Sequence, residues 1–237
     1  MLGVGRRGRS RRILGVAVVA VAFSSLASVP AASAADDGPL ALLEQLAETL
    51  RRQPAWSSGY HQDFVPAGMT VGEEVDGRVR VAWPDQALFE SGQPVIRLMG
   101  LEHRLLRLVD LDLPSCETHV LSDEEWARIP LAAVLDPRAA LDEFTILDTG
   151  ARAFTLVPRQ PGGVARVEVV LGDDNLPQQV TVIDPQGAVN RLDFSGWRPS
   201  APPASGWLPE APSGVECVGE PAPAPPGDDG GRGRLRR

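Results

Sequence analysis

Two cysteines are the residues of this chain with the clearest chemical potential. Cys116 and Cys217 are its only thiols among 237 residues, and in an exported protein such a pair is expected to form a disulfide. The alternative is a metal site, because Cys116 and His119 offer a thiol and an imidazole in one short segment. His61 and His103 show no ligand spacing. We therefore predict a disulfide and no metal, and this loop closure stabilises by about 4–5 kcal/mol on the chain-entropy model.

Residues that could perform catalysis do not fall into a recognisable pattern. Ser195 lies in Phe194-Ser195-Gly196-Trp197, which lacks the G-x-S-x-G spacing of a nucleophile elbow. The acidic pairs stand in turns and at helix starts, where solvation and capping account for them. No glycine-rich loop opens a helix after a strand. The sequence thus predicts a protein that is not an enzyme and needs no cofactor.

Residues 1–34 predict an export signal. Five arginines precede an apolar run from Ile13 to Val29, and Ala32-Ser33-Ala34 supplies an A-x-A cleavage site. An uncleaved membrane anchor is the alternative, but serines and a proline interrupt the run, which is short for a span. Because arginines surround Ser10, the leader is compatible with both Sec and twin-arginine export. We expect a mature periplasmic protein that begins at Ala35.

Charge and composition limit the partners of the mature chain. Without the leader, 18 basic residues face 31 acidic ones, a net charge of −13, which argues against nucleic acid and anionic lipid surfaces as partners. Residues 219–237 are rich in proline, glycine and arginine and predict a disordered tail. One domain of roughly 180 residues, 35–218, lies between leader and tail.

The segment from Ala153 to Trp197 predicts an antiparallel meander of four strands. Apolar and polar residues alternate along it, which places one set on each face of a strand. Turn-forming residues at 172–175 and 184–187 separate the strands. A sheet with one apolar face must cover that face. The apolar set includes Phe154, Leu156, Val167, Val169, Val180, Val182, Leu192 and Phe194.

Further strands are predicted upstream of the meander. Trp56 to Phe64 predicts a strand, and Val71 to Val81 predicts a hairpin that turns at Asp76-Gly77, because Asp-Gly favours two-residue turns. Three short strands follow, within Trp83–Phe89, Val95–Met99 and Leu105–Leu111. In total we expect about 10–11 antiparallel strands, a number that suits a strongly curved sheet or a half-open barrel.

Helices are predicted at the start and in the middle of the domain. Pro39 to Arg52 carries Leu43, Leu46 and Leu50 on one face, at helical spacing. A capping box at Ser122–Glu125 opens a short helix to Arg128, and Asp136-Pro137 opens another, Arg138 to Phe144. The fold class is therefore α+β, a curved sheet covered by an N-terminal helix and short middle helices.

In the order of its elements the chain resembles the periplasmic lipoprotein carriers of the LolA type. Phe154-Thr155-Leu156-Val157-Pro158 is similar to that family's F-x-L-x-P strand, and Gly172–Leu176 to its G-x-D/N-G/L turn. The segment from Trp207 to Val218 resembles its closing F-x-P-P-x-G-V-x-V. The resemblance extends over Leu40–Val218 and implies a carrier that holds the acyl chains of lipoproteins in an apolar cavity.

The resemblance also implies which residues form the cavity and its lid. The apolar segment from Ile129 to Leu135 stands where the family has its second lid helix, commonly x-P-x-x-L-L-L; an ordinary buried helix is the alternative. Ala82-Trp83-Pro84 replaces the family's K/R-R-P, so the arginine that latches the lid is missing. Besides the apolar set of the meander, the expected cavity and lid residues are Leu43, Leu46, Leu50, Trp83, Phe89, Leu98, Leu131, Val134 and Leu135.

Two functions are compatible with this resemblance. The first is a monomeric carrier that takes acylated lipoproteins from an inner-membrane releasing transporter to an outer-membrane acceptor. The second is a sensor similar to RseB, which detects lipids or mislocalised lipoproteins in envelope-stress signalling. Such a sensor normally has a second domain after the half-barrel, whereas this chain continues into a proline-rich tail. We therefore expect the carrier.

Overall fold

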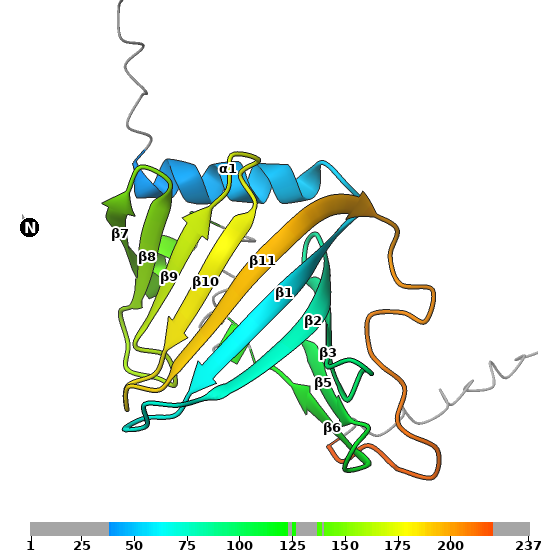
Figure 1. Cartoon of the computed structure of the whole chain (residues 1–237). Helices are drawn as coiled ribbons and strands as arrows, with labels where there is room; N and C mark the ends of the chain where they lie inside the picture. Colours follow the sequence, from blue (N-terminus) through cyan, green and yellow to red (C-terminus); the bar gives the residue numbers. More distant parts are fainter. Residues whose placement is uncertain (1–37, 123–124, 127–136, 139, 220–237) are drawn as a thin grey trace, which may run out of the picture. The chain divides into compact units, whose positions relative to one another are not determined.

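Eleven antiparallel strands form one open, curved sheet. The computed structural model describes residues 38–122, 125–126, 137–138 and 140–219. The strand order is β6-β5-β4-β3-β2-β1-β11-β10-β9-β8-β7, so β6 and β7 are the two edges and the sheet does not close (Figure 1). This confirms the predicted fold class. The strands are β1 (Ala55–Val65), β2 (Glu73–Ala82), β3 (Gln86–Ser91), β4 (Arg97–Glu102), β5 (Leu105–Asp110), β6 (Ser115–Val120), β7 (Phe144–Gly150), β8 (Ala153–Pro158), β9 (Arg166–Leu171), β10 (Pro177–Ile183) and β11 (Val189–Ser200).

The first and last strands pair at the centre of the sheet. β1 and β11 run antiparallel. Ser58 Oγ donates a hydrogen bond to the Ser195 carbonyl at 2.9 Å, and Gln62 Nε2 donates one to Asn190 Oδ1 at 2.9 Å. From this seam, β1 to β6 form what we call the N-terminal half of the sheet, and β7 to β11 the C-terminal half. Each half is a simple meander, because consecutive strands are neighbours.

The predicted meander from Ala153 to Trp197 is confirmed as β8 to β11. Val169 pairs with Phe154 on one side and with Val180 on the other, and Val180 pairs with Leu192. Residues that pair directly across strands point to the same face. The alternating apolar residues therefore share one face, as their spacing predicted.

The predicted hairpin turn at Asp76-Gly77 is wrong. Both residues lie inside β2, where Asp76 pairs with His61 and Gly77 with Tyr60. A Cβ atom on Gly77 would lie 2.3 Å from the Tyr60 ring, so glycine is required here because the ring covers the backbone. Asp76 faces the other way and contacts the His61 Nδ1 atom at 2.9 Å. The Asp-Gly pair therefore reflects tertiary contacts and not a turn.

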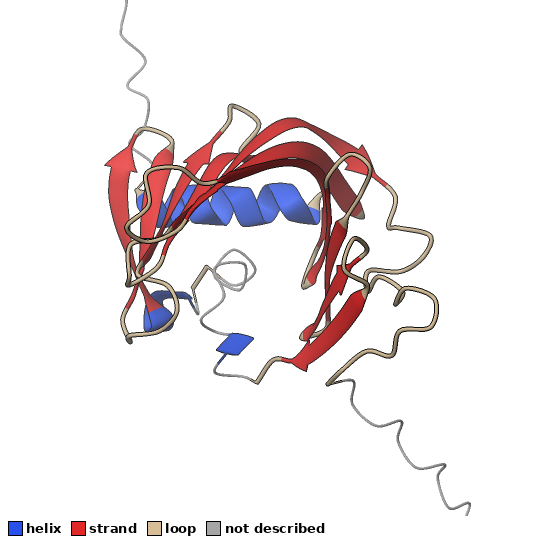
Figure 2. Ribbon diagram, turned by 60° about the horizontal axis from the view of Figure 1, so that its bottom comes forward, coloured by secondary structure: helices blue, strands red, loops and turns tan. Residues whose placement is uncertain are grey.

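Helix α1 (Pro39–Arg51) covers the inner face of the C-terminal half. Proline stands in its first turn, where the missing N–H costs nothing. Figure 2 shows the helix inside the curve of the sheet. Leu43 and Leu46 are almost fully buried, which is worth about 1.5–3 kcal/mol for each side chain. They belong to a core made of Leu42, Leu43, Leu46, Leu50, Ala140, Phe144, Phe154, Leu156, Val167, Val169, Leu171 and Leu176.

The middle of the chain is only partly described. The capping box is present, because the Glu125 N–H donates to Ser122 Oγ at 3.2 Å and the Ser122 N–H to Glu125 Oε2 at 2.8 Å. The predicted helix from Arg138 to Phe144 is shorter, since α4 spans Ala140–Glu143 and Phe144 begins β7. Within the described residues, neither helix is long and apolar enough to span a bilayer.

A C-terminal strap, residues 201–219, crosses the outer face of the N-terminal half. Trp207 packs there with Ala55, Ala82 and Leu88 in a second small core. A Cβ atom on Gly100 would lie 2.3 Å from the Trp207 carbonyl oxygen, so the strap can lie flat on β4 only at a glycine. The strap ends at β6, where the Val218 N–H donates to the Cys116 carbonyl at 2.9 Å.

The predicted disulfide is confirmed, since Cys116 and Cys217 are joined across a sequence separation of 101. Cys116 lies in β6 and Cys217 in the strap, so the bridge fastens the strap to an edge strand. Cys116 is therefore not available as a metal-binding thiolate. Among the described residues, no group of three or more His, Cys, Asp or Glu side chains could hold a metal ion.

Candidate ligand-binding cavity

An apolar pocket lies between α1 and the sheet, with a volume of about 200 Å³. It forms because the inner face of the C-terminal half continues across the central seam onto β2 and β3, and α1 covers only part of this surface. None of its described lining residues is charged. Its lining residues are Leu46, Leu50, Val79, Val81, Phe89, Leu156, Val167, Val169, Pro177, Val180, Leu192, Phe194 and Trp197.

A second, open pocket of about 520 Å³ adjoins the apolar pocket. The two share Phe89 and Leu192, which stand at their junction. The open pocket lies on the N-terminal half and has a mixed lining of apolar, hydrogen-bonding and charged side chains. Its lining residues are Tyr60, Gln62, Val75, Phe89, Ser91, Ile96, Arg97, Leu98, Met99, Leu108, Val109, Asp110, Ser115, Glu117, Asn190 and Leu192.

Polar contacts fix the side chains of the open pocket. The hydroxyls of Tyr60 and Ser91 are 2.6 Å apart. Burial raises the pKa of Tyr60, so its phenol stays protonated and can donate. Arg97 Nε donates to Asp110 Oδ2 at 3.3 Å. The N–H groups of Leu113 and Asp112 donate to Asp110 Oδ1, and the Leu113 bond is the main reason that the pKa of Asp110 is lowered. Asp110 is therefore a fixed carboxylate.

The structure brings most of the sequence-predicted cavity residues together. Nine of them line the apolar pocket: Leu46, Leu50, Phe89, Leu156, Val167, Val169, Val180, Leu192 and Phe194. Three others support it from the core, because Leu43 and Phe154 are fully buried and Val182 packs against the same cluster. Leu98 borders the open pocket. Its strand partner is Glu90, so Leu98 belongs to the sheet face opposite to that of Phe89.

The remaining predicted residues lie elsewhere. Leu131, Val134 and Leu135 lie outside the described residues, so their assignment to a lid stays a prediction. Trp83 lines neither pocket and stands in the turn after β2. Sequence reasoning missed Val79, Val81, Pro177 and Trp197 in the apolar pocket. The alternation of Val79 and Val81 was a usable signal, but it was assigned to the second arm of the hairpin that does not exist.

Trp83 contacts helix α1 directly. The Arg51 guanidinium carbon lies 4.0 Å from the centre of the Trp83 ring, a cation–π distance. Here the helix supplies the cation and the turn supplies the aromatic ring. This contact joins the end of α1 to the N-terminal half of the sheet.

We expect Trp83→Ala to loosen the last turn of α1. An exposed cation–π contact contributes about 0.5–1 kcal/mol, so amide hydrogen exchange in the last turn of α1, which contains Thr49 and Leu50, should accelerate a few-fold. Arg52→Ala is the control, because Arg52 is exposed and its ion pair with Glu48 is only at the 4.0 Å limit. Equal exchange in both variants and the parent would mean that Trp83 does not hold the helix.

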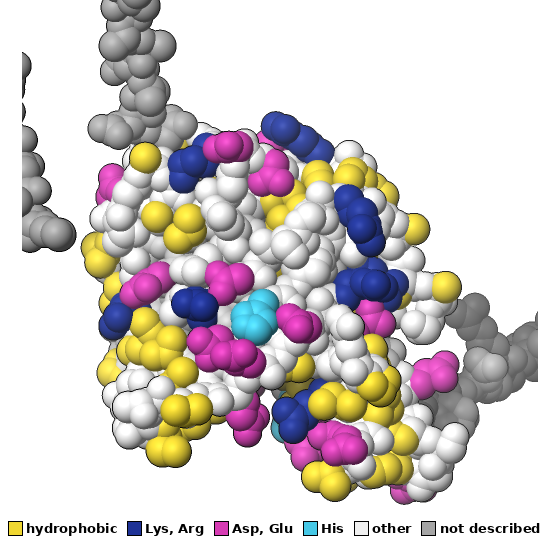
Figure 3. Space-filling view, viewed as in Figure 1, with side chains coloured by type: hydrophobic (Ala, Val, Ile, Leu, Met, Phe, Trp, Pro, Cys, Tyr) yellow, Lys and Arg dark blue, Asp and Glu magenta, His cyan; other side chains and the backbone are white. Residues whose placement is uncertain are grey.

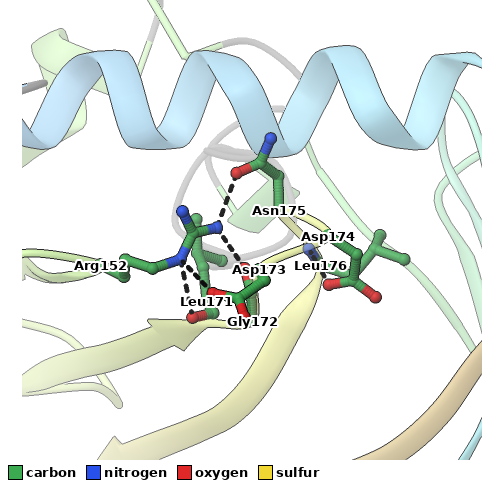
Figure 4. A network of polar contacts seen from close by, with 7 residues as sticks. All are labelled: Arg152, Leu171, Gly172, Asp173, Asp174, Asn175 and Leu176. Atoms are coloured by element: carbon green, nitrogen blue, oxygen red, sulfur yellow. Dashed lines mark hydrogen bonds and ion pairs between the residues drawn. The ribbon is translucent and has the colours of Figure 1, made fainter. Parts of the chain in front are cut away.

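Arg152 connects two hairpin turns of the C-terminal half. Its guanidinium donates to Asn175 Oδ1 at 2.7 Å, to the Leu171 carbonyl at 3.4 Å and to the Gly172 carbonyl (Figure 4). Arg152 belongs to the turn between β7 and β8, and its partners belong to the turn between β9 and β10. The network therefore joins two hairpins and sets the position of Leu176, which packs in the core.

The outer face of the sheet carries mixed charges (Figure 3), and His61 lies there beside Asp76. The hydrogen bond to Asp76 is the main reason that the pKa of His61 is raised above its ordinary value of 6.5. Because the folded-state pKa is raised, protonated His61 favours the fold. This contribution is complete below the unfolded-state pKa and disappears as the pH rises through the folded-state pKa.

We therefore expect the NMR titration midpoint of His61 to lie above 6.5. In Asp76→Asn the midpoint should fall toward the ordinary value, because the charged acceptor is gone. Glu74→Gln is the control, since Glu74 acts on His61 only through space and should change the midpoint less. A midpoint that is the same in Asp76→Asn and in the parent would contradict the role given to this hydrogen bond.

Similarity to known proteins agrees with the fold. No family model matches the chain. Proteins named outer-membrane lipoprotein carrier protein, from Xanthomonas campestris pv. campestris and Xanthomonas oryzae pv. oryzae, are each 25% identical to it over 169 residues, which cover 68% of this chain and 80% of the relative.

Similar solved structures include a LolA superfamily protein from Nitrosomonas europaea, with 9% identity, 73% of this chain and 98% of that chain covered, and a TM-score of 0.41. An uncharacterized conserved protein from Thermus thermophilus has 13% identity, covers 75% of this chain and 96% of that chain, and has a TM-score of 0.45. The chain is thus similar in sequence to outer-membrane lipoprotein carrier proteins, and its fold is an open, curved antiparallel sheet.

Proposed function

We propose that this protein is a periplasmic carrier that binds the acyl chains of lipoproteins and moves them from the inner to the outer membrane. The observation that carries the proposal is the apolar pocket, which lies between a helix and a curved sheet and whose described lining residues are all uncharged. The carrier relatives give the cargo class. In this proposal residues 1–34 direct export, 35–218 form the carrier domain and 219–237 form a tail.

Acyl chains suit this pocket on energetic grounds. Each CH₂ group removed from water contributes about 0.8 kcal/mol, so a chain of a dozen carbons binds without any polar contact. The pocket of about 200 Å³ is smaller than the ligand cavities of about 300–1,000 Å³ that proteins usually have. A diacyl ligand therefore extends past Phe89 and Leu192 into the open pocket, or α1 moves outward.

The carrier cycle needs partners at both membranes. A transporter at the inner membrane would load the acyl chains, and an acceptor at the outer membrane would remove them. Transfer in this direction requires that the acceptor binds the chains more tightly than the carrier does. The carrier works as a monomer in this proposal, since one chain supplies both pockets.

Native mass spectrometry of the mature protein purified from the periplasm tests this function. We expect a copurifying acylated peptide, with a mass that disappears after detergent extraction. The extracted protein should rebind a synthetic diacylated peptide. Protein that carries no acyl ligand and does not bind the diacylated peptide would overturn the carrier proposal.

A further inference from the structure

A polar row crosses the inner face of the N-terminal half. Tyr60 pairs with Gly77, Gly77 with Ser91, Ser91 with Arg97, and Arg97 with Asp110. Because directly paired residues share a face, the row runs along the sheet from the central seam toward β6. It begins with hydroxyl groups near the seam and ends with the Arg97–Asp110 ion pair, whose Nε–Oδ2 distance is 3.3 Å.

An apolar row runs beside the polar row. Phe89 pairs with Met99, and Met99 with Leu108. Phe89 is shared with the apolar pocket, whereas Met99 and Leu108 are each 37% exposed. Thus the apolar surface continues out of the pocket beneath α1 and into the open pocket, with hydrogen-bonding and charged groups along one side. Such a surface matches a ligand that is apolar along its length and polar at one end.

The charges of the open pocket specify the polar end. Among the lining residues that the structure describes, Arg97 is the cation, and Asp110 and Glu117 are the anions. Glu73, which pairs with Phe64 on the inner face, lines a neighbouring pocket together with Arg97 and adds a further carboxylate there. The Arg97 side chain is 64% exposed, so its N–H groups can still donate to carbonyl oxygens. A phosphate group, in contrast, would meet an arginine that already has a carboxylate partner and an excess of negative charge.

We propose that the open pocket binds the polar head of the carried lipid and selects a head that has ester or amide carbonyls and no phosphate. The inference rests on the proposed carrier function. The acyl chains occupy the apolar pocket and the Phe89–Met99–Leu108 row, while the head lies against Arg97 and Asp110. A diacylated peptide with a neutral or cationic head meets this requirement, and an anionic phospholipid does not.

Competition between ligands with identical acyl chains tests the selection. A fluorescent fatty acid is bound to the mature protein and displaced by a diacylated peptide with a free amino group, by diacylglycerol or by phosphatidylglycerol. We expect phosphatidylglycerol to bind about tenfold more weakly than the other two, because like charges at a partly solvated site are disfavoured. In the double variant Asp110→Asn, Glu117→Gln this difference should fall to about threefold or less, mainly through tighter binding of phosphatidylglycerol.

The controls separate this inference from the carrier function. Asp110→Asn keeps an Oδ1 atom for the N–H groups of Asp112 and Leu113, so the turn is retained. Asp112→Asn, in the exposed turn next to the pocket, should leave the selectivity unchanged. If the parent binds all three competitors equally, the head selection is wrong and the carrier proposal stands. If none of the diacyl ligands displaces the probe, the carrier proposal fails and this inference with it.

Discussion

Replacing Leu192 with glutamate is expected to weaken acyl-chain binding at least about 100-fold while the protein stays folded. Leu192 stands at the junction of the two pockets, so a carboxylate there lies in the path of every chain that occupies both. The same position lets the carboxylate turn toward the solvated open pocket when no ligand is bound, which limits the cost to folding. Titration of a fluorescent acyl probe measures the loss, and circular dichroism with thermal unfolding verifies the fold.

The preceding residue of the same strand, Arg191, provides a matched control. Arg191→Glu introduces the same side chain on the outer face. There the Arg191 side chain is 45% exposed and forms an ion pair with Asp193, with an Nε–Oδ2 distance of 3.0 Å. This variant should bind the probe as the parent does. Normal acyl binding by Leu192→Glu would mean that ligands do not pass the junction, and an unfolded Leu192→Glu variant would assign Leu192 to the permanent core.

Among the variants considered, removal of the Cys116–Cys217 disulfide should cause the largest loss of stability. The double variant Cys116→Ser, Cys217→Ser is expected to lose about 2–5 kcal/mol of the free energy of unfolding, because the bridge closes a loop of about 100 residues. The strap would then be held to β6 by the backbone bonds near Val218, and to the rest of the N-terminal half by the packing of Trp207 and the hydrogen bond from Arg107 to the Pro209 carbonyl. Urea unfolding of the parent and the variant measures the difference.

Reduction of the parent provides the internal control for this prediction. Added reductant should lower the unfolding midpoint of the parent to that of the double variant, and it should not change the variant. Acyl binding below the unfolding transition should remain, because neither cysteine lines the apolar pocket. A parent that unfolds at the same urea concentration with and without reductant would contradict the stabilising role of the bridge.

The apolar part of this molecule was readable from the sequence, for a physical reason. The apolar face of α1 packs against the inner face of the C-terminal half of the sheet. The helix and the strands therefore each show hydrophobic residues at their own period. The sequence alone thus predicted Leu46, Val169 and Val180 as cavity residues, and all three line the apolar pocket. Two cysteines in an exported chain were likewise sufficient to predict the disulfide.

The polar lining of the open pocket could not be predicted from the sequence, because its side chains face inward without being apolar. Ser91, Arg97 and Asp110 lie on the inner face of the sheet, where alternation alone assigns polar residues to solvent. β6 was missed for the same reason, since Ser115–Val120 is largely polar. Gly77 shows the limit of turn rules, because its lack of a side chain is explained by Tyr60, which is distant from any turn.

The central pairing of β1 with β11 has a consequence for how the chain reaches its native state. Contacts across this seam join residues 128 and 137 positions apart, and such long-range pairing is slow to form, because a large loop must close first. The apolar face of α1 also has its partners in β8 and β9, late in the sequence. The helix core therefore waits for β9, and the seam waits for β11, the last strand. A chain with this strand order stays open until its synthesis is nearly finished, which is the state that the export proposed for this protein requires.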